Sequence, residues 1–120
     1  MEPSPPDVVV RRDDATRLYE ALIDGEVVGT LAYETAGGHV SLTHSYVDRA
    51  HRHQGVASAL ARYALEDLRQ RNTKPGIYCG FVADYVQDHP EWNDAVDINH
   101  SNLIAPRTTR ETNGGSGLNR

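Results

Sequence analysis

The chain reads Arg52-His53-Gln54-Gly55-Val56-Ala57 at the point where a strand-like segment gives way to an amphipathic helical one. The first N–H groups of a helix have no partner within it, and the helix dipole favours negative charge there. Gly55 has no Cβ to hinder an anion, Ala57 keeps the first turn open, and Arg52 adds positive charge. This loop therefore predicts a phosphate site at the start of the helix.

A simpler interpretation of the loop is that its glycine only eases a turn into the helix. The segment is not a P-loop, since the Gly-Lys-Ser/Thr ending is absent, and it lacks the further glycines of a dinucleotide fingerprint. His51 and His53 could add charge when protonated. With His44 they could also suggest zinc ligation, but no nearby cysteine or second histidine pair completes a ligand set, so no metal is expected.

Beyond the loop, the pattern is first helical and then changes. From Gln54 to Gln70, apolar residues recur at helical spacing, at Ala57, Leu60, Ala61, Ala64 and Leu68. Pro75 cannot continue a helix, so the segment around it ends this one. The elements expected next are a short strand over Ile77–Val82, parallel to the strand before the loop, and short helices over Ala83–Asp88 and Glu91–Val96.

Before the loop, alternating residues predict strands. Turn signals at Asp24-Gly25 and Gly37-Gly38 separate them, which favours an antiparallel meander. The expected strands are a Val-rich run within Asp7–Asp13, then Thr16–Asp24, Val27–Glu34 and His39–Val47. In the last strand, strict alternation places Val40, Leu42, His44 and Tyr46 on one face. The predicted fold class is α+β: a meander, a central amphipathic helix, a short strand and one or two C-terminal helices.

Composition limits the possible partners. The chain has 120 residues, 38% of them apolar, and a formal net charge of −5. Duplex nucleic acid is bound chiefly by neutralising its phosphates, so it is not the expected partner. No apolar run approaches the roughly 20 residues that span a bilayer, and the acidic, Pro-rich start lacks the features of a signal peptide. One cysteine forms no internal disulfide, so a reduced, cytoplasmic setting is the simplest interpretation.

The length suits one domain. Residues 1–6 are expected to form a flexible lead, residues 7–97 the folded domain, and residues 98–120 a disordered tail without periodicity. A monomer is expected, because no large apolar helix face is left over after the helix packs on the sheet.

The loop and its flanks resemble a known family. Arg52, Gly55 and Ala57 fit the pattern Arg/Gln-x-x-Gly-x-Gly/Ala, the acyl-CoA signature of GNAT acetyltransferases. The flanking segments are His44-Ser45-Tyr46-Val47 before the loop and Cys79-Gly80-Phe81-Val82-Ala83-Asp84-Tyr85 after the helix. This order is similar to the compact GNAT-like subfamily of very short proteins, and the likeness covers about three-quarters of the chain, in line with one domain.

The resemblance implies acetyl-CoA as the cofactor and a sheet that splays after the His39 strand, with the pantetheine arm in the splay. Main-chain groups near Tyr46 and Val47 would pair with this arm. The pyrophosphate would lie on the loop, and the residues concerned are Arg52, His53, Gln54, Gly55, Val56 and Ala57. Two positions outside the loop depart from the family pattern. Ile77 replaces a proline, and Tyr46 stands where relatives often carry a glutamate base.

Four residues are candidates for the chemistry of acetyl transfer to an amine. Cys79 could accept the acetyl group as a thiolate, a role that the resemblance suggests, while His44 could act as base and Tyr85 or Tyr46 as acid. Each also has a structural interpretation, as an inert buried cysteine, a satisfied histidine or a packed tyrosine. Three hypotheses stay open: an N-acetyltransferase of unknown acceptor, a non-catalytic acetyl-CoA binding or sensing module, and an interaction domain with neither function.

Overall fold

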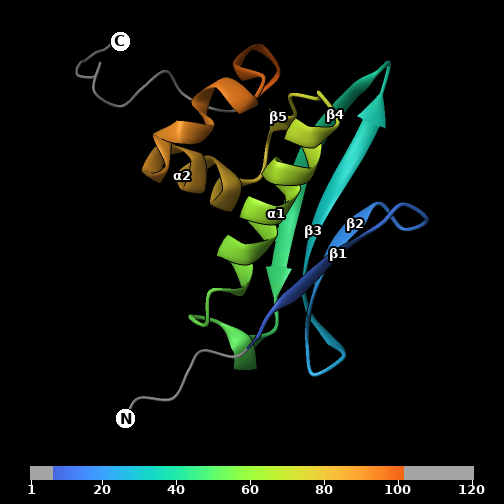
Figure 1. Cartoon of the computed structure of the whole chain (residues 1–120), viewed down its shortest axis with the longest axis vertical. Coiled ribbons are helices and arrows are strands. Elements are labelled where there is room, and N and C mark those ends of the chain that lie inside the picture. Colours follow the sequence, from blue (N-terminus) through green and yellow to red (C-terminus); the bar gives the residue numbers. More distant parts are fainter. Residues whose placement is uncertain (1–6, 102–120) are drawn as a thin grey trace.

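The computed structural model describes residues 7–101, which form a five-stranded sheet with helices packed beside it (Figure 1). The strands follow chain order across the sheet; the first four pair antiparallel, and β5 pairs parallel with β4. The strands are β1 (Val9–Asp13), β2 (Leu18–Ile23), β3 (Glu26–Ala36), β4 (His39–Val47) and β5 (Gly76–Ile77). The helices are η1 (Arg49–His51), α1 (Val56–Gln70), α2 (Gly80–Asp88), η2 (Pro90–Ala95) and η3 (Ile98–His100), where η marks a 3₁₀ helix.

This arrangement is the predicted α+β fold, with its meander, central helix, parallel short strand and C-terminal helices. The expected lead over residues 1–6 lies outside the described residues, as do residues 102–120 of the expected tail.

Two tight turns set the register of the meander. Asp24 and Gly25 have φ of 51° and 81°, and Gly37 and Gly38 have φ of 57° and 83°. Both central residues of each turn are therefore left-handed, as type I′ hairpin turns require. The turn signals in the sequence are confirmed.

One face of the sheet carries the core. Tyr19 pairs with Leu31 and Leu31 pairs with Ser45, so these three side chains share a face across β2, β3 and β4. The ring of Tyr19 contacts that of Tyr63 on α1, with centroids 6.0 Å apart. The shared face is therefore the one that α1 covers, and side chains that alternate with these three point away from α1.

A stripe of small and branched apolar residues brings α1 close to the sheet. The buried members are Val56, Leu60, Ala61, Ala64, Leu65 and Leu68. A Schellman motif closes the helix: the N–H of Thr73 donates to the carbonyl of Leu68 at 2.9 Å. Asn72, with φ of 56°, donates to the carbonyl of Arg69 at 3.0 Å. The helix thus ends where the sequence predicts, and it begins two residues later than predicted.

The segment after α1 differs from its prediction. The strand expected over Ile77–Val82 consists only of Gly76–Ile77, and a helix begins at Gly80. Cys79 therefore lies at the N-cap of α2, with φ −84° and ψ 125°, and not within a strand. The reason is that the apolar run continues at helical spacing and buries one helix face through Val82, Tyr85 and Val86. A short apolar run alone does not separate a strand from a buried helix.

The folded chain continues past Asp97, where the sequence places the end of the domain. Asp97 donates its N–H to the carbonyl of Pro75 at 2.9 Å, so η3 starts against the end of the sheet. Gly76 permits the close approach, because a Cβ at this position would lie only 2.0 Å from the carbonyl oxygen of His100. Strand β5 is therefore packed between β4 and η3.

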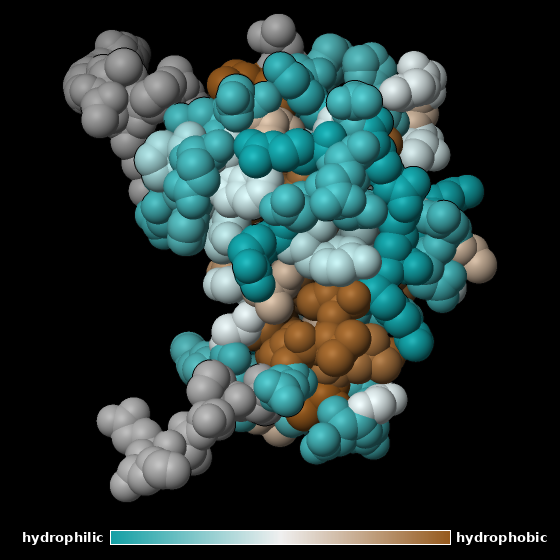
Figure 2. All heavy atoms as spheres, in the orientation of Figure 1, coloured by the Kyte–Doolittle hydropathy of each residue, from teal (hydrophilic) through white to brown (hydrophobic). Residues whose placement is uncertain are grey.

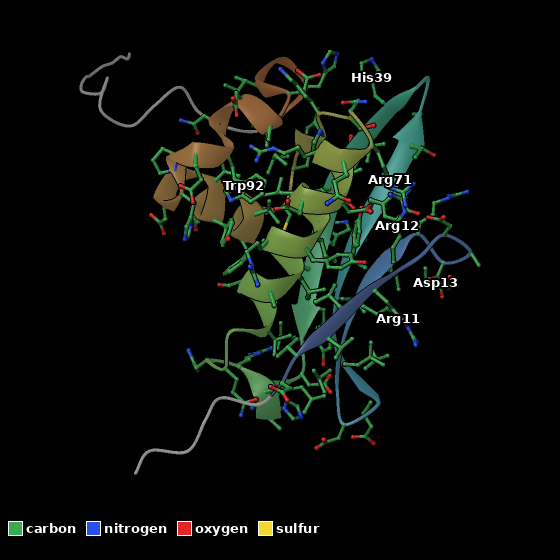
Figure 3. All side chains as sticks on the ribbon, in the orientation of Figure 1. Arg11, Arg12, Asp13, His39, Arg71 and Trp92 are labelled. Atoms are coloured by element: carbon green, nitrogen blue, oxygen red, sulfur yellow. The ribbon has the colours of Figure 1, made fainter. Side chains whose placement is uncertain are left out.

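A polar network joins β1 and β2 to the C-terminal half of α1 (Figure 3). Its centre is Asp67, whose carboxylate accepts hydrogen bonds from Arg12 (2.9 Å), the hydroxyl of Tyr19 (2.9 Å) and Arg71 (3.0 Å). Burial raises the pKa of Asp67, but the three donors outweigh burial and hold this pKa below its usual value. Burial, with the bond to Asp67, also raises the pKa of Tyr19, so the phenol keeps its proton and donates it.

The largest apolar area in Figure 2 lies beside the start of β1. A shallow pocket of about 310 Å³ lies between β1 and α1, lined by Val8, Val10, Ala59, Arg62, Tyr63 and Glu66. Among the described residues, no helix combines the length and the apolar character needed to cross a membrane.

Candidate functional site

The loop between β4 and α1 is left-handed at two positions. Gly55, the residue that precedes α1, has φ of 82°, and His53 has φ of 67°. Glycine adopts this conformation at little cost, whereas a residue with a Cβ is strained there. Arg52 ties the loop to the end of β4, because its Nε donates to the carbonyl of Val47 at 3.3 Å. The chain thereby leaves the strand and enters the helix within a few residues.

The start of α1 is open to an anion. No described side chain caps its first N–H groups, and its first turn holds no acidic residue. A shallow pocket of about 210 Å³ lies against it, lined by Val47, His51, Arg52, His53, Gly55, Val56, Ala57, Ser58 and Phe81. A Cβ built on Gly55 would meet no described atom within 4 Å. Uncapped N–H groups, the helix dipole and basic side chains together favour a phosphate group here.

The predicted loop residues contribute to this pocket in different ways. Val56 is 1% exposed and packs in the core, so only its main chain is available to a ligand. The side chain of Gln54 is close to another loop residue, with its Oε1 3.1 Å from Nδ1 of His51. Arg52 and His53 are exposed. Helix N–H groups and basic side chains are therefore the two sources of attraction for an anion.

An open edge of β4 leads away from the loop. Strand β5 pairs with β4 only at Ser41 and Leu42, after which the chain turns into α2. The N–H groups of Tyr78 and Cys79 donate to the carbonyl of Leu42 at 2.9 and 3.1 Å. Over residues 43–47, no described strand pairs with this edge. The sheet therefore splays after Leu42 and leaves main-chain groups of β4 available.

A β-bulge at Thr43 redirects the side chains of β4. Ala32 pairs with His44, whereas the next residue of β3 pairs with Leu42, so Thr43 is the extra residue. The alternation restarts one residue later, and His44 and Tyr46 point to the face that α1 does not cover. The prediction that these two side chains share the face of Leu42 was wrong. His44 is exposed, and Tyr46 is 57% exposed.

The same bulge turns Ser45 toward Cys79. The thiol of Cys79 donates a hydrogen bond to the hydroxyl oxygen of Ser45, with the two atoms 3.3 Å apart. The cysteine is buried, and the main chain on both sides of it is fixed: its N–H bonds to Leu42, and its carbonyl accepts from Ala83. A thiol and a hydroxyl thus lie in contact where the sheet splays.

Tyr85 and His44 do not join this pair. Tyr85 is buried, and its ring stacks on that of His89 with centroids 4.1 Å apart. His44 lies on the opposite face of the sheet from Ser45. Within residues 7–101, neither side chain makes a hydrogen bond to Cys79. The structure therefore brings together Cys79 and Ser45, and leaves the other two catalytic candidates apart from them.

Comparison with known sequences identifies the family of the chain. The family model described as GCN5-related N-acetyl-transferase matches residues 18–95, from the start of β2 to the end of η2. The chain belongs to the GCN5-related N-acetyltransferase family. The matched part of the chain includes the open edge of β4, the loop before α1 and the contact between Cys79 and Ser45.

Relatives named Protein NATD1 are similar to this family member over about two-thirds of the chain. The human protein is 34% identical over 83 residues, which is 68% of this chain and 74% of the human one. The mouse protein is 30% identical over 83 residues, with 68% and 76% covered. A solved ribosomal-protein-alanine N-acetyltransferase from Brucella melitensis biovar Abortus 2308 aligns with a TM-score of 0.46 at 22% identity, over 67% of this chain and 60% of that one.

Two residues of the site were missed by sequence reasoning. Ser45 alternates with the predicted core face of β4, and no glycine or proline marks the bulge that turns it inward. Phe81 lines the loop pocket although it was expected within a strand. The available signal was that Phe81 directly follows Gly80, a residue at which a helix could begin.

Proposed function

We propose that this protein is a small acetyl-CoA-dependent N-acetyltransferase whose loop from Arg52 to Ala57 binds the pyrophosphate of the cofactor. The observation that carries the proposal is the uncapped start of α1, with its open pocket and its basic side chains. The N–H groups of the first turn would donate to the phosphate oxygens. Arg52, and His53 when protonated, would neutralise their charge.

The pantetheine arm would lie along the open edge of β4. A strand edge offers N–H and C=O groups to an extended chain, and pantetheine is an extended chain with two amides. Pairing with the main chain at Tyr46 and Val47 would lead the arm from the loop pocket to Cys79 and Ser45. Family membership and the splay of the sheet after Leu42 support this path.

Transfer through Cys79 needs two steps. The thiol gives up its proton, its sulfur attacks the carbonyl carbon of acetyl-CoA, and the bond from that carbon to the CoA sulfur breaks, so that CoA leaves as a thiol after taking up a proton. The acceptor amine then attacks the acetyl-cysteine, and a proton from the amine returns to the sulfur. Ser45 would hold Sγ in place, and a strand N–H near Val47 would polarise the carbonyl.

Direct transfer from acetyl-CoA to the amine is the other route. Tyr85 is the candidate acid for the leaving thiolate, because it lies on the helix that Cys79 begins. His44 remains a candidate base only for an acceptor that binds on the face of the sheet away from α1.

The second candidate function is a non-catalytic acetyl-CoA binding or sensing module. The hydrogen-bond partner of the Cys79 thiol is a serine hydroxyl, and neither His44 nor Tyr85 reaches it. Tyr46 also occupies the position where the family resemblance leads one to expect a glutamate base. Such a module would keep the loop and the open edge of β4 without turning over acetyl-CoA.

Calorimetric titration of the full chain with CoA and, separately, with acetyl-CoA tests the cofactor site. Micromolar binding of either supports it, and release of free thiol from acetyl-CoA in the presence of a panel of amines then separates an enzyme from a binding module. No binding at millimolar ligand would overturn both functions. A monomeric state and a cytoplasmic location remain predictions from the sequence, and size-exclusion chromatography tests the first.

A further inference from the structure

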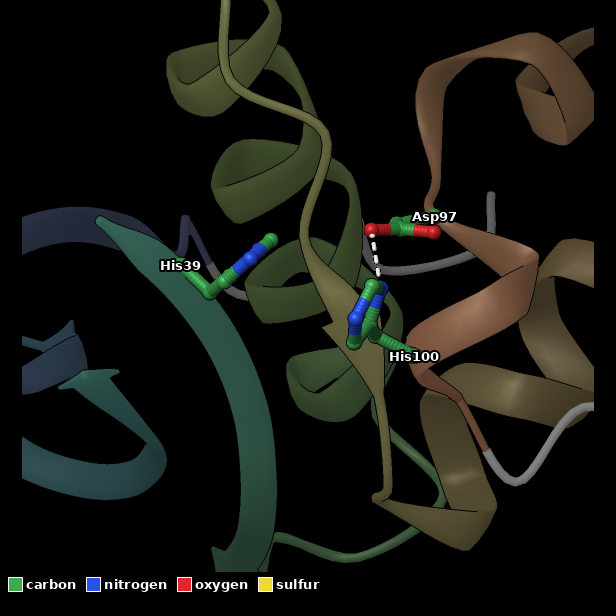
Figure 4. Close-up of side chains that lie close together, drawn as sticks. All are labelled: His39, Asp97 and His100. Carbon is green, nitrogen blue, oxygen red and sulfur yellow. Dashed lines mark hydrogen bonds and ion pairs between the residues drawn. The ribbon is translucent and has the colours of Figure 1, made fainter. Parts of the chain in front are cut away.

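Three metal-ligating side chains meet at the end of the molecule far from the loop (Figure 4). His39 is the first residue of β4, Asp97 comes directly before η3, and His100 is the last residue of η3. His39 and Val47 are the two ends of β4, so at about 3.3 Å per residue the cluster lies about 26 Å along the strand from the loop. The cluster is therefore separate from the proposed acetyl-CoA site.

The donor atoms of the cluster already lie close together. Nδ1 of His100 is 2.8 Å from Oδ2 of Asp97. The rings of His39 and His100 stack with centroids 4.5 Å apart and planes inclined by 29°. One ligand atom from each of the three residues lies within 4.8 Å of the other two. Two imidazoles and a carboxylate, drawn from segments nearly 60 positions apart, thus lie close together.

We propose that His39, Asp97 and His100 bind a divalent transition metal ion, with zinc as the ion that best fits the donor set. Neutral imidazole and carboxylate are ordinary zinc ligands, and sites with three protein ligands complete their coordination with water. Zinc–ligand bonds of about 2.0–2.2 Å place tetrahedral ligand atoms about 3.4 Å apart. Donor atoms that now lie up to 4.8 Å apart must therefore approach by at most roughly 1.4 Å, and the His100–Asp97 pair, now 2.8 Å apart, must separate slightly.

The required movement is confined to side chains. His39 and His100 are exposed, so their rings can turn until one nitrogen of each points at the ion. The main chain that carries the ligands is fixed: Asp97 bonds to the carbonyl of Pro75, and Gly76 packs directly against the carbonyl of His100. A bound ion would link the first residue of β4 to η3 and hold β5 between them.

Zinc titration of the full chain, purified without a histidine tag and freed of metal by a chelator, tests this proposal. Binding of one zinc ion per chain at micromolar concentration is expected, together with a rise in the melting temperature. His39→Ala and His100→Ala should each weaken zinc affinity at least tenfold, and Asp97→Asn should weaken it several-fold. Cobalt in place of zinc should give the visible absorption of a low-symmetry nitrogen–oxygen site, which the His39→Ala variant loses.

Histidines elsewhere in the chain supply the controls. His44 is an exposed histidine at the middle of the same strand, and the His44→Ala variant should bind zinc with the affinity of the parent. The double change His51→Ala and His53→Ala removes the other pair of neighbouring histidines and should also bind normally. Zinc affinity unchanged in His39→Ala, loss of binding in the double variant instead, or no binding at micromolar zinc would overturn the proposal.

Discussion

The Sγ atom of Cys79 lies 3.3 Å from the hydroxyl oxygen of Ser45, although the residues are 34 positions apart in the chain. Two irregularities of the backbone create this contact. The bulge at Thr43 turns Ser45 toward the α1 face, and the early end of β5 allows α2 to begin beside the splay. Without either one, the thiol and the hydroxyl would not face each other.

The covalent route predicts an acetyl adduct on this thiol. After incubation with acetyl-CoA, intact-mass spectrometry should show one added acetyl group in the parent protein and none in Cys79→Ala. Ser45→Ala should form the adduct about tenfold more slowly, because Sγ loses the partner that positions it. Ser41→Ala, which changes the same residue type in the same strand outside this contact, should behave like the parent. An adduct that persists in Cys79→Ala would exclude Cys79 as the acceptor.

Gly55→Asp tests the phosphate site. The substitution places a negative charge and a side chain in the open space over the start of α1, so CoA affinity should fall at least tenfold, about 1.4 kcal/mol. Gly25→Asp is the matched control, since Gly25 has nearly the same φ (81° against 82°) and is equally unobstructed, but lies in a hairpin turn. Calorimetry should show unchanged CoA affinity in Gly25→Asp. Equal affinities in the two variants would remove the loop from the site.

Asp67→Asn tests the network between α1 and the meander. Burial raises the pKa of Asp67, but its three donors hold this pKa below the unfolded value of about 3.9. The ionised carboxylate therefore stabilises the fold above about pH 4, and this contribution is lost as the pH falls through the folded pKa. Asp67→Asn should lower the free energy of unfolding by about 2 kcal/mol at neutral pH, and the difference should shrink at about pH 3. Urea unfolding measures both values.

The exposed neighbour Glu66 provides the control for this network. Glu66→Gln removes the same charge from α1 without touching Arg12 or Tyr19, so its free energy of unfolding should stay within about 0.5 kcal/mol of the parent. A difference between Asp67→Asn and the parent that does not depend on pH would contradict the assignment to the ionised carboxylate.

Gly76→Ala tests the docking of η3 on β5. The added Cβ would meet the carbonyl oxygen of His100 at 2.0 Å, so the segment that follows Asp97 must move. A cost of about 2 kcal/mol is expected, which corresponds to a fall of about 10 °C in the melting temperature. Gly80→Ala is the control, because a Cβ on Gly80 would meet no described atom within 4 Å. Equal melting temperatures for both variants would show that η3 does not pack as described.

Much of the fold is predictable because local chemistry and tertiary packing agree. The residue types at Asp24-Gly25 and Gly37-Gly38 favour left-handed turns, and these turns mark the ends of the alternating strands. The alanine stripe of α1 and its stop before Pro75 are likewise local properties. The position of the loop at the start of α1 could be predicted for the same reason, since the start of a helix offers N–H groups whatever surrounds it.

The rest depends on tertiary contacts that a short pattern does not contain. No glycine or proline marks the bulge at Thr43. Strict alternation therefore could not predict to which face of the sheet His44, Ser45 and Tyr46 point. The apolar run after Gly76 suits a strand as well as a helix, and packing of its helical face decides between them. The meeting of His39 with His100 likewise requires the docking of η3, which no local signal reveals.

The two ends of α1 are unequal. At its last turn, backbone carbonyls are bonded within the Schellman motif and Asp67 is bound from three sides, whereas the N–H groups of the first turn have no side-chain cap. Amides in the first turn should therefore exchange with solvent deuterium quickly, and those nearer the other end slowly. A ligand in the loop pocket would slow exchange only of the first-turn amides. Hydrogen exchange would therefore detect a bound molecule even if the protein never converts it to product.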